Sequence, residues 1–502
     1  MVAKVMAFGD TRDEARARLV SALRDFDLVI ERGATNKSYL IQLLEAEAYR
    51  EGSVDTRWLD RWNEERDTQP PHAVEAIVLA AILSYRAQWR ADRRNFFADT
   101  SSITPDKIPA LHGRELDLEY RGESYRLRVF SVGSSRYRVH LDNRVISARF
   151  GDPEQHTARL VIAGRYLRAV HDVTDASIRV EVEGFAHRFG RQTAGQVRAG
   201  APSMVVSVDV KPGDKVKAGQ TLGMVEAMKM EIGFSAPVAG TVTEVRVTKG
   251  QQVAAGDTLI VIEPLREEGV EVAAGARLRL PDEVDPLAML FDESEAGEGG
   301  APNLLAAGRA PAEQRKAAMQ AVGDEIRRIL LGFDLSERRF HKLLDFLEAE
   351  LPEGLSSEFR DQLVEVSSSL SVFVSVEQLF SRARPVSERG ELGPSNSARF
   401  RGYLRRMRSQ GSGIAADFLD MLKSALRHYG ISSLEHSDDL EKAIFRMFAT
   451  QRDPEPRRRL IMAVLRRLIA LTDLGVGASQ DEELREALVR IATLRDMVGN
   501  AL

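Results

Sequence analysis

Residues 199–226 read AGAPSMVVSVDVKPGDKVKAGQTLGMVE, and 37 positions later residues 236–263 read APVAGTVTEVRVTKGQQVAAGDTLIVIE. The two stretches align without a gap and share valines, turn glycines and a Thr-Leu pair at equivalent positions. Each stretch alternates apolar and polar residues between glycine turns, which predicts a set of short strands. Two such halves are expected to pack face to face over residues 197–264, as a flattened β-sandwich with pseudo-twofold symmetry.

Four residues, Ala227-Met228-Lys229-Met230, lie between the two halves, where one half must turn into the next. The surrounding run, Val225–Glu231, resembles the biotinylation hairpin of biotin carboxyl carrier domains, in which the lysine is joined to biotin by an amide bond. The resemblance implies covalent biotin on Lys229. It also implies four flanking recognition residues: Glu226, Ala227, Met228 and Met230. Residues 235–240 resemble the second-half turn of the same family.

The chemistry of the lysine agrees with this resemblance. A lysine that accepts an acyl group must protrude on a tight turn, so that its amine can enter the active site of a ligase. Flanking methionines are flexible and apolar, which suits a surface that docks into several partner sites in turn. Two alternatives stay open, namely an ordinary exposed lysine and a lipoyl carrier domain, whose lysine usually lies between an acidic and a small residue. Gly200 replaces the first proline of the family's usual Ala-Pro-x-Pro, which concerns the rigidity of that turn and not the attachment site.

The composition excludes several classes of protein and of site. The chain has 502 residues, 43% hydrophobic and 29% charged, which is typical of a soluble protein with several globular domains. Its net charge of −5 provides no basic field for nucleic acid or for an anionic membrane. There are no cysteines, which excludes disulfides, thiolate zinc sites, iron–sulfur clusters and cysteine nucleophiles. No secretory signal and no apolar run of membrane-spanning length is visible, so we expect a cytoplasmic protein.

Residues 1–66 predict two helices. Thr11 to Glu14 has the spacing of a capping box, helical periodicity continues to Phe26, and a second short helix is expected after Thr35. This stretch resembles the C-terminal tail of the biotin carboxylase domain of fused acyl-CoA carboxylases. The matching pieces are Val2–Val5, Thr11–Ala15, Thr35–Ser38 and Val54–Thr56. The ATP-binding parts of that domain would lie before Met1, so we expect a fragment or a truncated reading frame.

Residues 70–192 change from helical to strand periodicity. Residues 72–92 place their apolar side chains on one helix face, and from Glu115 to Phe189 apolar and polar residues alternate. Turns are predicted at Arg121-Gly122, Asp142-Asn143, Ala163-Gly164 and Glu183-Gly184. Short strands at regular spacing predict a small antiparallel barrel. A helix and a barrel just before the carrier resemble the linking domain that docks carboxylase and transferase parts in biotin-dependent carboxylases.

The rest of the chain is predicted to be a linker, residues 265–311, and an all-helical region, residues 312–502. The linker is rich in Gly, Ala, Glu and Pro, whereas the later residues follow helical spacing over about eight helices. Two groups of arginines, within 399–408 and 457–467, are interpreted as solvated helix faces or ion pairs, not as nucleic-acid contacts. The region resembles the non-catalytic central helical region of eukaryotic-type acetyl-CoA carboxylases, best at Arg408–Ile414.

These resemblances imply a multidomain α+β chain that is the biotin carrier and scaffold part of a biotin-dependent acyl-CoA carboxylase, a carbon–carbon bond-forming ligase of fatty acid biosynthesis. Carboxybiotin on Lys229 would move from a biotin carboxylase to a carboxyltransferase acting on acetyl-CoA or propionyl-CoA. The expected partners are these two enzymes and biotin protein ligase, within a larger oligomer. No catalytic residue and no metal site is predicted, so the chain alone is expected to be non-catalytic. A carboxylase for pyruvate or urea, and a scaffold that never receives biotin, are the alternatives.

Overall fold

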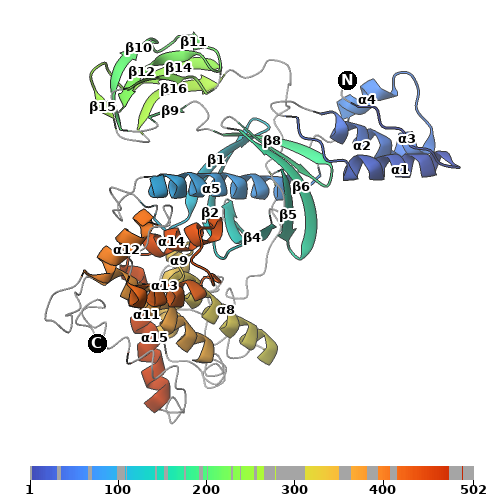
Figure 1. The fold of residues 1–502 in the computed structure, drawn as a ribbon. Helices are drawn as coiled ribbons and strands as arrows, with labels where there is room; N and C mark the ends of the chain where they lie inside the picture. The colour runs from blue at the N-terminus through green and yellow to red at the C-terminus, as the bar shows by residue number, and fades with distance from the viewer. Residues whose placement is uncertain are drawn as a thin grey trace. The chain divides into compact units, whose positions relative to one another are not determined.

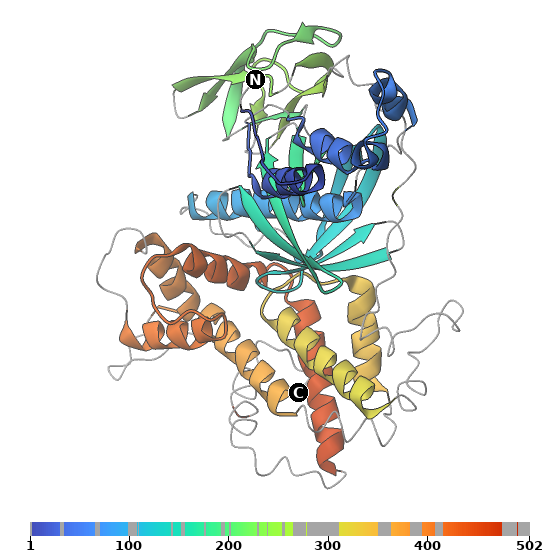
Figure 2. The same cartoon turned by 90° about the vertical axis from the view of Figure 1, so that its right-hand side faces the viewer.

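The structure, a computed structural model, describes residues 3–30, 35–65, 71–98, 108, 110–141, 144–151, 156–174, 177–191, 196–199, 202–227, 230–237, 239–253, 257–264, 278, 311–349, 363–381, 394–406, 415–473 and 489. The chain divides into two compact units, which are described separately. The first contains Met1–Tyr85, Glu115–Val129 and Tyr137–Asp282, and the second contains Arg86–Arg114, Phe130–Arg136 and Glu283–Leu502. Helices, a barrel and two further sheets are present (Figure 1, and turned in Figure 2), which confirms the multidomain α+β class.

Four short helices open the first unit: α1 (Arg12–Asp25), α2 (Lys37–Glu45), α3 (Glu47–Glu51) and α4 (Trp58–Glu65). Thr11 caps α1, because its hydroxyl oxygen accepts a hydrogen bond from the Glu14 N–H at 3.2 Å. The Glu14 carboxylate in turn accepts the N–H of Asp10 at 2.9 Å, one residue earlier than in a complete capping box. The predicted helix after Thr11 and the short helix after Thr35 are both confirmed.

Helix α5 (Ala73–Ala98) precedes eight strands that follow one another around a closed antiparallel barrel. The strands are β1 (Arg114–Tyr120), β2 (Glu123–Ser131), β3 (Arg136–Leu141), β4 (Arg144–Gly151), β5 (Thr157–Ile162), β6 (Arg165–Val173), β7 (Ser177–Val182) and β8 (Phe185–Arg191). Pairing of β1 with β8, where Leu118 faces Arg191, closes the barrel. The predicted helix and barrel are confirmed, whereas the predicted turn at Asp142-Asn143 lies outside the described residues.

Three barrel hairpins turn through two consecutive residues with left-handed backbone. Arg121, Ala163 and Glu183 have φ angles of 54°, 49° and 50°, and the glycine after each has a φ between 75° and 88°. Two positive φ angles in a row are the mark of a type I′ turn, whose twist matches that of paired strands. The glycines at these positions therefore fix three two-residue hairpins, as the sequence predicted.

Helices α1 and α2 pack on the barrel through a small apolar core. Val20 and Leu23 of α1 and Ile41 and Leu44 of α2 are buried together with Phe185 of β8. Each pair is spaced three residues apart, so its two side chains lie on the same face of their helix. Burial of side chains of this size contributes about 1.5–3 kcal/mol each. The N-terminal helices and the barrel thus share one core within the first unit.

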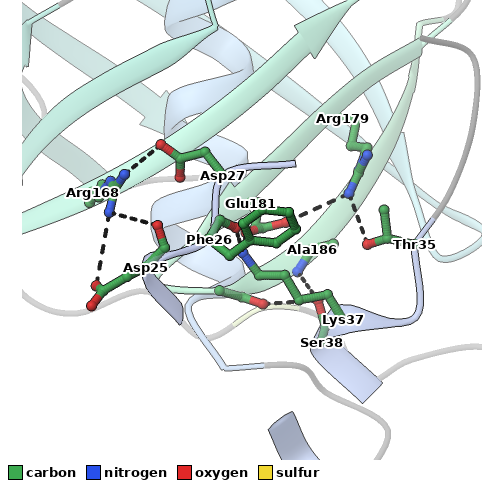
Figure 3. A network of polar contacts seen from close by, with 11 residues as sticks. Asp25, Phe26, Asp27, Thr35, Lys37, Ser38, Arg168, Arg179, Glu181 and Ala186 are labelled. Carbon is green, nitrogen blue, oxygen red and sulfur yellow. Dashed lines mark hydrogen bonds and ion pairs between the residues drawn. The ribbon is translucent and has the colours of Figure 1, made fainter. Parts of the chain in front are cut away.

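A buried ion pair lies beside this core (Figure 3). The Lys37 ammonium of α2 lies 2.5 Å from a carboxylate oxygen of Glu181 in β7, and each side chain is only 4% exposed. Lys37 also donates to the carbonyl oxygen of Phe26 at 2.5 Å. Arg179 lies 3.6 Å from the second Glu181 oxygen and donates to the hydroxyl of Thr35 at 3.2 Å. The charge of Glu181 is therefore neutralised from two sides.

Two further contacts join the same helices to the barrel (Figure 3). The hydroxyl of Ser38 donates to the Gly184 carbonyl at 3.0 Å and accepts the N–H of Ala186 at 2.7 Å, so it bridges the start of β8. Nearer the solvent, a guanidinium nitrogen of Arg168 lies 2.5 Å from a carboxylate oxygen of Asp27. Thr35, Lys37 and Ser38, which belong to the sequence piece Thr35–Ser38, thus contact the barrel directly.

Eight strands form the carrier sandwich: β9 (Gln196–Arg198), β10 (Ser203–Val208), β11 (Lys215–Val216), β12 (Thr221–Ala227), β13 (Met230–Ser235), β14 (Gly240–Val245), β15 (Gln252–Val253) and β16 (Thr258–Pro264). They make two four-stranded sheets, with the orders β13-β12-β10-β15 and β11-β14-β16-β9. One apolar core lies within this segment, and Leu222, Leu259 and Ile260 are completely buried in it. The predicted flattened sandwich is confirmed.

In the second unit the described residues of 311–473 are largely helical. The helices are α8 (Ala312–Leu330), α9 (Glu337–Glu348), α11 (Leu363–Phe380), α12 (Asn396–Arg406), α13 (Ala416–Arg427), α14 (Asp438–Ala449) and α15 (Glu455–Asp473). Most of the linker at 265–311 and most of 474–502 lie outside the described residues, so a wholly helical C-terminal region remains a prediction. No helix in the described part of the chain is both long and apolar enough to cross a bilayer.

The second unit also includes part of α5. Trp89 packs edge-on against Phe445 of α14, with ring centroids 4.9 Å apart, and Phe96 lies 5.2 Å from Phe448. The end of β2 joins as well, because the Ser131 N–H donates to the Asp334 carboxylate at 2.8 Å. The C-terminal helices therefore do not build their core alone, but share it with residues that the sequence analysis placed with the barrel.

Members of both arginine groups form ion pairs in this unit. A guanidinium nitrogen of Arg399 lies 2.8 Å from Asp417, and its hydrogen bond holds the pKa of that carboxyl below the usual value. Arg457 is buried and lies 3.1 Å from the buried carboxylate of Glu377. Ion pairing of these arginines agrees with the interpretation made from the sequence.

We expect removal of Lys37 to weaken the first unit. In Lys37→Met, Glu181 loses its closest cation inside a buried site, and breaking such a pair costs about 3–5 kcal/mol of unfolding free energy. The double variant Lys37→Met/Glu181→Leu should recover most of this loss, because neither charge is then buried alone. Urea unfolding followed by circular dichroism measures the effect.

The exposed pair on the same interface is the control for this experiment. Arg168 is half exposed, so Arg168→Ala should cost at most about 1 kcal/mol. Equal losses of unfolding free energy in Lys37→Met and Arg168→Ala would show that burial of the Lys37–Glu181 pair does not increase its contribution to stability.

His187 makes the barrel sensitive to acid. Its Nδ1 lies 2.9 Å from the hydroxyl of Tyr120, and both side chains are inside the barrel. Burial lowers the pKa of His187 from 6.5 to about 4, and burial raises the pKa of Tyr120 to about 12. The unfolded chain therefore binds a proton at His187 near pH 6.5, whereas the folded barrel does not until about pH 4.

Since the unfolded state binds more protons between pH 6.5 and pH 4, the free energy of unfolding should fall as the pH is lowered through this window. In His187→Gln the decline should be shallower, because glutamine does not titrate. Urea unfolding of both proteins at several pH values tests this, with exposed His341→Gln as the control. If the unfolding free energies of the wild type and His187→Gln declined in parallel as the pH was lowered, His187 would not be the source of the acid sensitivity.

Candidate biotinylation hairpin

Every strand in the first half of the carrier sandwich has a counterpart 37 positions later. Shifted by this amount, β10, β11 and β12 coincide with β14, β15 and β16, and β9 falls on the last residues of β13. The register repeats as well, since Ser203 faces Val253 just as Val216 faces Gly240. The internal repeat of the sequence is therefore a structural repeat, with the predicted pseudo-twofold symmetry.

Backbone hydrogen bonds lock the two halves together. The N–H of Gly213, in the first half, donates to the carbonyl of Val242 at 2.7 Å. The N–H of Gly250, its counterpart, donates to the carbonyl of Val205 at 2.8 Å. The two glycines have φ angles of 97° and 84°, which side chains rarely tolerate. A turn glycine of each half thus donates a hydrogen bond to a backbone carbonyl in the first strand of the other half.

Strands β12 and β13 form the hairpin on which the predicted attachment site lies. They pair in register up to Ala227 and Met230. Phe234, Ile232 and Met230 alternate along β13 and so share one face, and their exposed fractions are 9%, 49% and 66%. The apolar face of β13 is therefore buried at Phe234 and increasingly exposed to solvent toward Met230.

Met228 and Lys229 themselves lie outside the described residues, but both of their neighbours are described. Ala227 ends β12, Met230 begins β13, and the two form the last pair of the ladder. Under the pseudo-twofold symmetry, this connection corresponds to the start of β9 and the end of β16. The chain enters the sandwich at β9 and leaves it at β16. The connection that holds Lys229 is thus at a different end from the segments that tie the sandwich to the rest of the chain.

These surroundings fit a covalently carried cofactor. Biotin attached to a lysine amine needs an accessible strand end and apolar surface nearby, not an enclosing cavity. Met230 and Ile232 provide exposed apolar surface beside the connection, and the buried Ala227 anchors it to the core. No group of metal-ligating side chains occurs among the described residues.

Two acidic residues face each other next to the connection. Glu226 of β12 is directly opposite Glu231 of β13, and neither forms an ion pair with another described residue. Like charges at directly opposed positions destabilise paired strands by up to about 1 kcal/mol. The hairpin thus presents two opposed acidic residues beside the predicted attachment site, and no described residue neutralises them with an ion pair.

Of the recognition residues predicted from the sequence, the structure brings together Glu226, Ala227 and Met230. Glu231 and Ile232, which the sequence analysis did not name as recognition residues, lie beside them. The position of Glu231 opposite Glu226 depends on the pairing register of β12 and β13, which the sequence does not give. Ile232 could have been found, because it lies two residues from Met230 and therefore on the same face of the strand.

Gly223 of β12 leaves no room for a side chain. A Cβ atom there would lie 2.3 Å from the carbonyl oxygen of Ser207 and 2.5 Å from the ring of Phe234. At Gly233, on the facing strand, the nearest atom to an added Cβ would be a Thr221 methyl carbon at 3.7 Å, an ordinary contact. The two glycines therefore provide a matched pair of test positions.

We expect Gly223→Ala to destabilise the sandwich by about 1–3 kcal/mol, because backbone and ring must move to admit the methyl group. Gly233→Ala should leave its stability nearly unchanged. Hydrogen–deuterium exchange of peptides from β12 and β16 in the whole chain, read by mass spectrometry, measures the change. Similar protection in both variants would contradict the close packing at Gly223.

Comparison with known proteins agrees with this geometry. Residues 194–262 match the family model of biotin-requiring enzymes, and residues 1–61 match that of the biotin carboxylase C-terminal domain. The chain is 23% identical over 250 residues to acetyl-CoA carboxylase of Schizosaccharomyces pombe, which covers 48% of this chain and 11% of that protein. It is 31% identical over 161 residues to acetyl-CoA carboxylase 2 of Arabidopsis thaliana, covering 31% and 6%.

A mitochondrial propionyl-CoA carboxylase alpha chain of Rattus norvegicus is 24% identical over 266 residues, covering 48% of this chain and 35% of that protein. The aligned part is thus between about a third and a half of this chain and at most about a third of these relatives. The chain is therefore homologous over about half of its length to acetyl-CoA and propionyl-CoA carboxylases, and it contains a biotin carrier domain at residues 194–262.

Proposed function

We propose that the chain is the biotin carrier and scaffold part of a biotin-dependent acyl-CoA carboxylase, with biotin in amide linkage to the amine of Lys229. The observation that carries the proposal is the β12–β13 hairpin, whose ladder ends at Ala227 and Met230 on the two sides of Lys229. The match to the biotin-requiring enzymes and the similarity to acyl-CoA carboxylases support it.

In this function Lys229 is a tether and performs no acid–base chemistry. When bound, biotin would carry a carboxyl group from a biotin carboxylase to a carboxyltransferase. Attachment to the hairpin raises the effective concentration of the carried group at both enzymes. Exposed Met230 and Ile232 offer apolar surface to each partner in turn, and the acidic residues Glu226 and Glu231 lie beside the lysine that a biotin protein ligase would modify.

The remaining parts of the chain serve as a scaffold in this proposal. The N-terminal helices and the barrel form one packed body, and the second unit has a core to which Trp89 of α5 contributes. Biotin carboxylase and carboxyltransferase, within a larger oligomer in the cytoplasm, would supply the catalytic sites. The acceptor would be acetyl-CoA or propionyl-CoA, since the relatives carry these two names.

We expect a single biotinyl group on Lys229. Co-expression with a biotin protein ligase should give a chain that binds labelled avidin and whose intact mass is increased by one biotinyl group. Lys229→Arg should abolish both signals, because arginine cannot accept the biotin carboxyl group.

The control is Lys249→Arg, which removes an exposed lysine from another turn of the same sandwich and should leave both signals unchanged. Avidin binding that persists in Lys229→Arg, or a lipoyl instead of a biotinyl mass in the wild type, would refute the proposed attachment.

A further inference from the structure

A pocket of about 420 Å³ lies within the first unit, where α1, the start of α5 and the barrel meet. Its volume is in the range of sites that bind small organic molecules, about 300–1,000 Å³. The residues that line it include Arg24 of α1, His72 before α5, and Arg165, Glu183 and Phe185 of the barrel. The proposed carrier function uses none of these side chains.

The backbone at His72 is strained without a hairpin to explain the strain. Among the described residues, a positive φ at a residue other than glycine occurs at Arg121, Ala163, Glu183 and His72. The first three begin type I′ turns of the barrel, which require this conformation. His72, with a φ of 64°, instead directly precedes α5, and its ring centroid lies 6.0 Å from that of Phe185. Backbone strain of this kind is concentrated at functional sites, and here it occurs at a residue of the pocket.

The cationic side chains of the pocket keep unused hydrogen-bond donors. Arg24 donates to the Glu45 carboxylate at 2.7 Å, but a guanidinium has five N–H groups. The guanidinium of Arg165 lies 3.6 Å from a Glu75 oxygen and forms no hydrogen bond within the described part of the chain. Nδ1 of His72 lies 3.7 Å from the same oxygen, which is also beyond hydrogen-bond distance. The pocket therefore offers N–H groups that no described acceptor occupies.

Carboxylates reduce the positive charge at the pocket but leave these donors available. Glu45 and Glu75 each lie beside one arginine, and Glu183 is among the lining residues. One oxygen of Glu183 accepts the backbone N–H of Arg168 at 2.7 Å, which fixes that carboxylate on the barrel. Arginine can bind a second carboxylate or a phosphate through its remaining N–H groups, in a bidentate geometry. An anionic ligand is therefore the class that the free donors fit.

The walls of the pocket are fixed by contacts within the first unit. A guanidinium nitrogen of Arg168 lies 2.5 Å from Asp27, which holds the chain after α1 on β6 (Figure 3). At Gly184 an added Cβ atom would lie 3.3 Å from Cγ of Arg24 and 3.0 Å from Cδ1 of Ile41. The aliphatic part of Arg24 is thus packed closely against the turn before β8. A preformed site of this kind binds without the cost of ordering its walls.

We propose that this pocket binds a small organic anion. Arg24 and Arg165 hold its carboxylate or phosphate group, His72 donates a further hydrogen bond to that group, and an apolar or planar part of the ligand packs on Phe185. The site is separate from the predicted biotin attachment at Lys229, so the inference goes beyond the proposed function and does not depend on it.

Ligand-observed NMR titrations of the whole chain test the proposal. The probes are benzoate and phenyl phosphate, which share an aromatic ring but differ in their anionic group, and benzamide, the neutral counterpart of benzoate. Both anions should bind at least about tenfold more tightly than benzamide, because the neutral amide cannot form charge-assisted hydrogen bonds with arginine as an anion does. The order of the two anions distinguishes carboxylate from phosphate recognition.

A pair of arginine variants locates the site. Arg165→Met should weaken binding of both anions at least about tenfold, because it removes a cationic donor from the pocket. The Arg165 side chain is 62% exposed, so the fold should tolerate this change. The matched control is Arg159→Met, which removes an exposed arginine from the neighbouring strand β5, outside the pocket, and should bind like the wild type.

His72→Gly separates binding from stability. Glycine adopts a positive φ without strain, so this variant should unfold at the same or a higher urea concentration than the wild type. It should nevertheless bind the anions at least about threefold more weakly, because the imidazole donor is lost. A histidine with only a structural role would give the opposite result, namely lower stability and unchanged binding.

Three results would overturn the proposal. Equal affinities for benzoate and benzamide would refute an anion site, and equal binding by Arg165→Met and Arg159→Met would refute this pocket as its location. No binding of either anion at concentrations on the order of 10 mM would refute both. These measurements do not involve Lys229, so their failure and the failure of the proposed carrier function are distinguishable.

Discussion

The carrier sandwich depends on backbone hydrogen bonds that each half can form only with the other. Gly213 donates to Val242, and its counterpart Gly250 donates to Val205. A buried backbone group without a partner is costly, so neither half can be completed alone. The two halves must meet in one register. That register in turn determines that the ladder of β12 and β13 ends at Ala227 and Met230, on either side of Lys229.

Around this connection the hairpin departs from what stability alone would favour. Glu226 and Glu231 are paired although their charges repel, and Met230 and Ile232 are exposed although they are apolar. Elsewhere in the sandwich apolar side chains fill the core and polar ones face the solvent, as alternation requires. Local conflicts of this kind in an otherwise consistent domain are expected at functional sites. The conflict therefore lies beside Lys229, where we propose that biotin is attached.

Features that depend on neighbouring residues were predictable from the sequence, and features that depend on distant partners were not. Glycine spacing and alternation identified the repeated strands and the type I′ turns of the barrel, and a local resemblance led to the prediction of Lys229, which stays a prediction. Nothing local marks Lys37 as buried, because lysine is rarely buried unless paired and its partner Glu181 lies far along the chain. Helical periodicity likewise showed that α5 has an apolar face, but not that Trp89 packs on Phe445.

The Lys37–Glu181 pair helps to fix the position of the N-terminal helices on the barrel. Burying both charges costs desolvation energy, and an apolar pair of similar volume would hold the helices about as firmly. The ion pair therefore contributes chiefly to specificity, since only one placement of α2 on the barrel satisfies both charges and the hydrogen bonds of Ser38.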